Sequence, residues 1–150
     1  MNWHADWAWS LPLIVINVMI HVFSLGLITQ MAQRVLSGIR GRRHFLTVSA
    51  FALSVIVTLV TLLHGFEAQV WAMAYWLLGA LPDYSSAVLY SLNAMTSYGH
   101  TNLYLEPRWE LMGALEALNG MLLFGLSTAF LFNMLRNVWV TYGIKKQRQP

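Results

Sequence analysis

Long stretches without charge are the feature of this sequence that most limits its fold. The ranges 7–33, 45–66 and 117–135 contain no Asp, Glu, Lys or Arg. Each range provides roughly the 20 helical residues needed to cross a hydrocarbon core. Only 10% of all residues are charged and 57% are hydrophobic, whereas about 25% are charged in ordinary soluble domains. The sequence therefore predicts an all-α membrane protein with three transmembrane helices.

The basic residues predict how these spans are oriented. Eight of the nine Lys and Arg residues lie in the segments after the first and third spans, which the positive-inside rule assigns to the cytoplasm. We therefore expect a multi-pass protein of the cell membrane, with its N-terminus outside and its C-terminus in the cytoplasm. The eight residues are Arg34, Arg40, Arg42, Arg43, Arg136, Lys145, Lys146 and Arg148.

Residues 68–107 are apolar but too interrupted to form another spanning helix. Asp83 is a good N-cap for a short helix over residues 84–95, and the polar, glycine-containing segment 96–102 follows it. Non-helical backbone at membrane depth is tolerated only where it is buried in protein or lines a water-filled cavity. This pattern predicts a re-entrant pore helix and filter loop between the second and third spans. An amphipathic helix resting on the outer membrane surface is the alternative.

The order of these segments resembles the pore module of the two-helix potassium-channel superfamily, with an additional N-terminal helix. The filter of that family reads T-T-V-G-Y-G-D, and Thr96-Ser97-Tyr98-Gly99-His100-Thr101-Asn102 occupies the corresponding place. In the third span, Phe124-Gly125-Leu126-Ser127-Thr128-Ala129 resembles the inner helix, and Gly120 falls at the hinge glycine. The resemblance covers residues 58–135. It divides the chain into an N-terminal helix with a basic loop (1–44), a pore module (45–140) and a cytoplasmic tail (141–150).

The resemblance implies a homotetrameric cation channel embedded in lipid. It implies monovalent cations, with K⁺ as a candidate, held in a filter of Thr96, Ser97, Tyr98, Gly99, His100 and Thr101. It also implies a cavity and hinge of Gly120, Met121, Phe124, Thr128 and Phe132. If Gly99 matches the first filter glycine, Thr101 stands in place of the second. If Tyr98-Gly99 instead matches the terminal Tyr-Gly of the filter, the second glycine is kept and the first is lost. Because filter glycines help to present backbone carbonyls to the ion, ion selectivity does not follow from the resemblance.

Motifs typical of other functional classes are absent from the sequence. The sequence has no phosphate-binding glycine loop, nucleophile elbow or H-E-x-x-H pair, so we do not expect an enzyme. We expect no cofactor and no metal site. The basic residues near the membrane are interpreted as topology signals, so nucleic acid is not an expected partner.

Ionisable residues within the spans form a second candidate site. His64 and Glu67 are three residues apart and share a helix face, and Glu116 is expected at a similar depth on the third span. We expect His64 or Glu67 to contact Glu116 or the back of the pore helix, as a proton-sensitive link. A buried polar contact that only fixes helix packing is the alternative. His21 is interpreted as a hydrogen-bonding residue between helices.

The third span has two faces of different character. Its small residues allow another backbone to approach closely, whereas its asparagines suggest a face toward water or the pore. The potassium-channel resemblance instead places Met121, Phe124, Thr128 and Phe132 toward the cavity, and we adopt that assignment. The small residues are Gly113, Ala117, Gly120 and Ser127, and the asparagines are Asn119, Asn133 and Asn137.

Two other functions remain as alternatives. His21 and His64 lie on different spans, as the axial ligands of a haem-binding membrane anchor do. A non-conducting assembly partner, with a channel-like scaffold and an altered filter, is the second.

Overall fold

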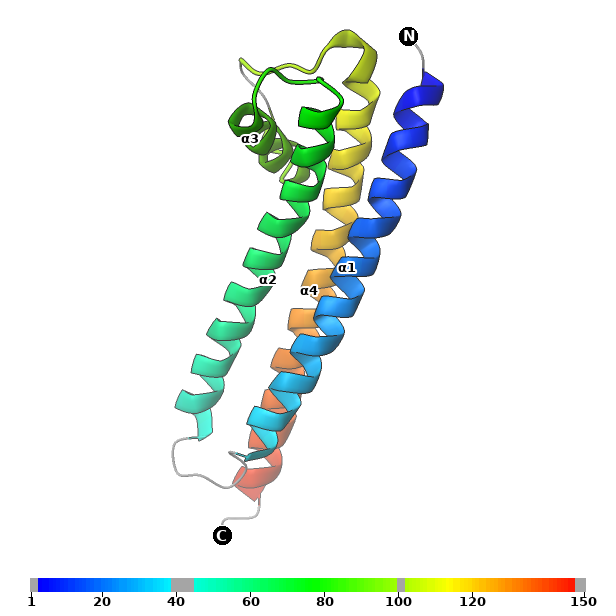
Figure 1. Ribbon diagram of the computed structural model, residues 1–150. Coiled ribbons are helices and arrows are strands. Elements are labelled where there is room, and N and C mark those ends of the chain that lie inside the picture. Colours follow the sequence, from blue (N-terminus) through cyan, green and yellow to red (C-terminus); the bar gives the residue numbers. More distant parts are fainter. Residues whose placement is uncertain (1–2, 39–44, 100–101, 148–150) are drawn as a thin grey trace.

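Three long helices and one short helix make up the protein. The computed structural model describes residues 3–38, 45–99 and 102–147, and it contains no strand within these ranges. The long helices pack side by side, and the short helix lies at the end of the bundle that carries the N-terminus (Figure 1). The helices are α1 (Trp3–Gly38), α2 (Phe45–Leu77), α3 (Tyr84–Met95) and α4 (Glu110–Gln147), and the 3₁₀ turn η1 (Pro107–Trp109) precedes α4.

All three long helices are long and apolar enough to cross a membrane. The candidate spans are Trp3–Val35, Phe45–Leu77 and Pro107–Val140. α2 continues through Gly65 without a break, and its 33 residues extend over about 50 Å, against a hydrocarbon core about 30 Å thick. The predicted all-α membrane protein with three spanning helices is thus confirmed.

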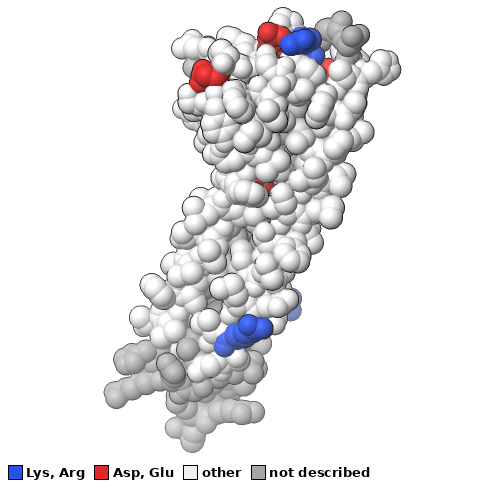
Figure 2. All heavy atoms as spheres, in the orientation of Figure 1, with Lys and Arg blue, Asp and Glu red and all other residues white. Residues whose placement is uncertain are grey.

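Charged residues gather at the two ends of the bundle. Figure 2 shows a nearly uncharged surface between an end with both acidic and basic residues and an end with basic residues. Arg34 and Arg136 lie toward the end at which α1 and α4 finish. The other predicted basic positions, 40, 42, 43 and 148 and the side chains of 145 and 146, lie outside the described residues. The orientation across the membrane stays a prediction.

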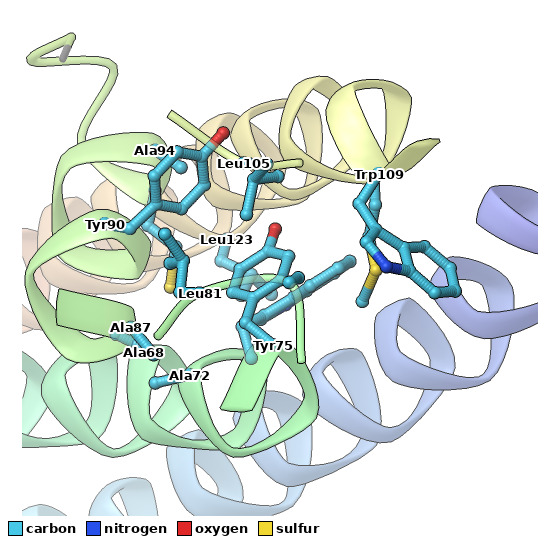
Figure 3. Packing of buried hydrophobic residues seen from close by; sticks show 14 residues of the cluster. Ala68, Ala72, Tyr75, Leu81, Ala87, Tyr90, Ala94, Leu105, Trp109 and Leu123 are labelled. Carbon is cyan, nitrogen blue, oxygen red and sulfur yellow. The ribbon is translucent and has the colours of Figure 1, made fainter. Parts of the chain in front are cut away.

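The best-packed part of the molecule is the end where α3 lies between α2 and α4. Trp71, Tyr75 and Met112 are fully buried there, and Tyr90 packs edge-on against Tyr75, with ring centroids 5.3 Å apart (Figure 3). Toward the other end the bundle has a smaller core around Val60. The α3 end therefore has the larger share of the hydrophobic stabilisation.

Local signals explain where α3 begins. The predicted N-cap is confirmed, because Asp83 Oδ1 accepts a hydrogen bond from the backbone N–H of Ser86 at 2.9 Å. Hydrogen bonds from the Ser85 hydroxyl and from the backbone and side chain of Ser86 lower the pKa of the exposed Asp83 carboxyl to about 2. Gly79, with φ +63°, lies in the turn that reverses the chain after α2.

The small residues of α4 admit close contacts, as their spacing predicts. A Cβ atom on Gly120 would lie 2.3 Å from the carbonyl oxygen and 2.7 Å from Cα of Met95, the last residue of α3. A Cβ on Gly113 would lie 2.2 Å from the Tyr90 hydroxyl. α4 and α3 therefore meet backbone to backbone at Gly120.

Candidate functional site

The predicted filter segment begins at the C-terminal end of α3. The N–H of Ser97 donates to the carbonyl of Ala94 at 3.0 Å and the N–H of Tyr98 donates to that of Asn93 at 3.0 Å, with Ser97 at φ +54°. This is a Schellman motif, which satisfies the last carbonyls of the helix. Gly99, at φ +90°, adopts a conformation that favours glycine.

The filter residues in the described part of the chain are exposed. Thr96, Ser97, Tyr98 and Gly99 all face solvent in the single chain, and 84% of the Tyr98 surface is accessible. His100 and Thr101 lie outside the described residues.

Four of the five predicted cavity and hinge residues also lie on the surface of the single chain. Met121, Phe124, Thr128 and Phe132 are exposed on α4, and the fifth, Gly120, is buried against α3. The Phe124 ring also stacks on an imidazole, that of His64, with centroids 4.2 Å apart.

The three asparagines of α4 do not form one water-facing stripe. Asn133 and Asn137 are exposed, but Asn119 is fully buried, and neither of its amide atoms has a hydrogen-bond partner among the described residues. Asn119 therefore does not face water in the single chain. The spacing placed these residues on one face but could not tell which neighbouring helix covers part of that face.

The first buried polar cluster surrounds Glu116 and connects α2, α3 and α4. The Tyr75 hydroxyl donates to Glu116 Oε2 at 2.6 Å. The Ser91 hydroxyl pairs with Glu116 Oε1 and lies 2.7 Å from the Ala68 carbonyl oxygen. Since a hydroxyl has one proton, Ser91 cannot donate to both oxygens. The hydrogen bonds are complete when the Glu116 carboxyl is protonated and donates to Ser91.

The second buried cluster consists of His21, His64, Glu67 and Ser127, and we call it the His–Glu–His cluster. Nδ1 of His21 lies 2.8 Å from Glu67 Oε1, and Nδ1 of His64 lies 3.2 Å from Glu67 Oε2. On the opposite side, Ser127 Oγ lies 3.0 Å from Nε2 of His64 and 3.2 Å from Nε2 of His21. This closed ring connects α1, α2 and α4.

The structure thus divides the three residues of the predicted polar link between two clusters. His64 and Glu67 pair with each other and with α1, whereas Glu116 contacts the pore-helix candidate α3 through Ser91. The two clusters adjoin along α2, where Glu67 belongs to one and the carbonyl of Ala68 to the other.

Sequence reasoning missed two roles. It treated Ser127 only as a small residue of the packing face, and it did not pair His21 with Glu67, 46 residues away. The position of the polar His21 within an apolar span is the signal that pointed to contacts with other helices. A further carboxylate, Asp6, accepts a hydrogen bond at 3.2 Å from the N–H of Met112 in the first turn of α4. Asp6 therefore caps a helix other than its own.

Comparison of the chain with protein-family models, with curated proteins and with solved structures finds no match.

Proposed function

We propose that this chain forms a homotetrameric channel for monovalent cations, with α2, α3 and α4 as its outer, pore and inner helices. The observation that carries the proposal is α3, a 12-residue helix inserted between two spanning helices and followed by irregular backbone. Twelve residues extend about 18 Å, which is too short to cross a core about 30 Å thick. The C-terminal end of such a helix carries partial negative charge, which favours cations.

The attachment of α3 supports this role. A filter needs a fixed backbone, and α3 is held at two points along α4. One is the backbone contact between Met95 and Gly120, and the other is the buried pair of Ser91 and Glu116. Residues 96–99 begin directly after the first of these points, so their start has a fixed position relative to α4.

The exposed side chains of α4 are consistent with a cavity shared between copies. Met121 and Phe132 keep 63% and 68% of their surface accessible in the single chain. In the proposed tetramer, these residues and Thr128 line the cavity below the filter. K⁺ is the first candidate ion, although the segment retains only one of the two family glycines.

The geometry gives no support to the haem-binding alternative. The His21 and His64 ring centroids are 5.2 Å apart, and both rings face the same carboxylate, that of Glu67. Axial haem ligands bind iron from opposite faces of a macrocycle, which needs a clear gap between the rings. A non-conducting assembly partner differs from a channel only in ion flux.

The test is ion flux in proteoliposomes loaded with K⁺, comparing the wild type with Gly99→Ala and Gly79→Ala. Both glycines have positive φ, and a Cβ on either would meet no atom within 4 Å. The two substitutions therefore impose a similar strain of about 1–2 kcal/mol, but only Gly99 belongs to the filter candidate.

We expect flux in the wild type and in Gly79→Ala, with a decrease of at least about 10-fold in Gly99→Ala, equivalent to about 1.4 kcal/mol. Equal flux in both variants would remove residues 96–99 from the permeation path. An absence of flux in the wild type would favour the non-conducting partner. Cross-linking of the reconstituted protein checks that the assembly contains four chains.

A further inference from the structure

The His–Glu–His cluster cannot satisfy all its hydrogen bonds with two neutral imidazoles and an ionised Glu67 carboxylate. Both Nδ1 atoms face the Glu67 carboxylate, so each imidazole would carry its proton on Nδ1. Both Nε2 atoms then become acceptors, and both face the single hydroxyl of Ser127. That hydroxyl can donate to only one of them. In this buried ring, one nitrogen lone pair is left facing an oxygen lone pair.

Further polar atoms beside the carboxylate also lack hydrogen bonds. Among the described residues, Nδ1 of His64 and Oε2 of Glu67 are buried without a hydrogen-bond partner, although they lie 3.2 Å apart. Oδ1 of Asn17 is a third such atom, and the Asn17 amide donates to the Glu67 backbone carbonyl at 3.4 Å. Buried polar groups without partners are rare in native proteins, and a bound ion is one explanation for them.

A metal ion between the two Nδ1 atoms and the carboxylate would resolve both problems. Each imidazole would bind the ion through Nδ1 and carry its proton on Nε2. Ser127 Oγ has two lone pairs and could accept both N–H groups. Metal-bound histidines usually donate their second N–H to an oxygen in this way. The atoms of His64 and Glu67 that now lack partners would become ligands.

The donor set and its spacing fit a divalent transition-metal ion. Two imidazoles and one carboxylate are typical ligands of Zn²⁺. One ligand atom from each of His21, His64 and Glu67 lies within 4.8 Å of the others. Nδ1 of His21 lies 2.8 Å from Oε1 of Glu67, and Nδ1 of His64 lies 3.2 Å from Oε2, so each imidazole approaches a different oxygen of the same carboxylate. Facing helices supply the ligands, as in the metal sites of helical bundles.

We propose that His21, His64 and Glu67 bind one divalent transition-metal ion of the Zn²⁺ class per chain, and that Ser127 orients both imidazoles. The ion links α1 to α2 directly and to α4 through Ser127. This proposal goes beyond the proposed channel function and does not depend on ion conduction.

The experiment measures Zn²⁺ binding to the full chain in detergent micelles. The protein is stripped with a chelator, then titrated with Zn²⁺ in competition with a chromophoric chelator, and its metal content is determined by mass spectrometry. We expect one ion per chain and a thermal unfolding midpoint that rises with Zn²⁺. Co²⁺ in place of Zn²⁺ should give the intense visible absorption bands of a tetrahedral site.

Substitutions of the proposed ligand residues, with Zn²⁺ affinity as the measurement, test where the ion binds. Glu67→Gln and His64→Asn should each lower the Zn²⁺ affinity at least about 100-fold, because each removes a ligand. Ser127→Ala should lower it about 10-fold, as expected for a residue that orients ligands. His4→Ala removes an exposed histidine on α1, and Thr128→Val removes the hydroxyl that donates to the Phe124 carbonyl. Both control variants should keep the wild-type affinity within about 2-fold.

Several results would overturn the proposal. One is a wild-type chain that binds no stoichiometric Zn²⁺, and another is an unchanged affinity in His64→Asn. His64 is partly exposed, so that variant carries the test if Glu67→Gln fails to fold. In NMR of the Zn²⁺-treated protein, an imidazolium signal from either cluster histidine, or the signal of a protonated Glu67 carboxyl, would show that a proton and not a metal ion completes the ring. A failure of ion flux would leave these measurements unaffected.

Discussion

Glu67 and Glu116 are both fully buried on spanning helices, but their surroundings differ in kind. Glu116 lies between two hydroxyl groups, and its hydrogen bonds close when the carboxyl carries a proton. Glu67 lies between two imidazoles in a ring whose donors and acceptors do not match when Glu67 is ionised and both imidazoles are neutral. Burial of an acidic residue alone therefore does not distinguish helix packing from ligand binding. The unmatched atoms around Glu67 make that distinction.

The largest expected effect comes from removing the Glu116 carboxyl, which is the centre of the first buried cluster. Glu116→Ala leaves a cavity and strands the buried Tyr75 hydroxyl, so we expect a loss of about 3–5 kcal/mol in the free energy of unfolding. Unfolding in mixed micelles, followed by circular dichroism, measures the loss. Glu116→Gln keeps the volume and one acceptor and should cost less than about 1.5 kcal/mol. If Ala and Gln cost the same, hydrogen bonding does not explain why Glu116 is buried.

A second variant measures how much the backbone contact between α3 and α4 stabilises the fold, apart from the hydrogen bonds of Glu116. In Gly120→Ala, the new methyl group would overlap the backbone of Met95, which cannot turn away as a side chain can. We expect a loss of about 1–3 kcal/mol in the same unfolding assay. Gly125→Ala is the matched control on the same helix, since its Cβ would meet no atom within 4 Å. A neutral Gly120→Ala would mean that Glu116 alone positions α3.

The same substitution at both glutamates compares their charge states directly. Glu67→Gln removes a charged acceptor from two imidazoles, whereas Glu116→Gln replaces a neutral acid with a neutral amide. Hydrogen bonds to charged groups are stronger, so we expect Glu67→Gln to cost about 1–2 kcal/mol more, measured on metal-free protein. Equal costs would show that the two carboxyl groups are in the same protonation state.

The smallest expected effect concerns Asp83, an exposed carboxylate that serves as a reference for the two buried carboxyl groups. Its pKa is about 2 in the folded chain, against an ordinary value of 3.8. Because the folded pKa is lowered, the stabilisation of α3 is fully present above about pH 4. It is lost as the pH falls toward 2. Hydrogen exchange of the Ser86 and Ala87 amides, corrected for intrinsic rates, should show this loss.

Asp83→Asn is the control for that measurement. Asparagine keeps a capping oxygen but does not titrate in this range. The variant should protect the same amides independently of pH between 4 and 2. A pH dependence that persists in Asp83→Asn would assign the effect to another group.

Features set by neighbouring residues could be predicted from the sequence. The three spans follow from charge-free length, the start of α3 follows from a capping residue, and the pairing of His64 with Glu67 follows from their spacing on one helix turn. The close approach at Gly120 was also predictable, because small residues recur on that face, although its partner Met95 was not.

Contacts between distant segments could not be predicted in the same way. Glu67 meets His21 across 46 residues, and Glu116 meets Ser91 across 25. Both pairings depend on how the helices rotate about their axes when they pack. The buried Asn119 shows the same limit, because a stripe of polar residues indicates a shared face but not what covers it.

The contact between Gly120 and Met95 has a mechanical consequence. No side chain lies between the two backbones, so no rotamer change can absorb a movement of one against the other. A bend or rotation of α4 at this point would displace the end of α3 by a similar distance, and residues 96–99 would move with it. Gly120 and Met95 are therefore expected to move together, and the start of residues 96–99 moves with them.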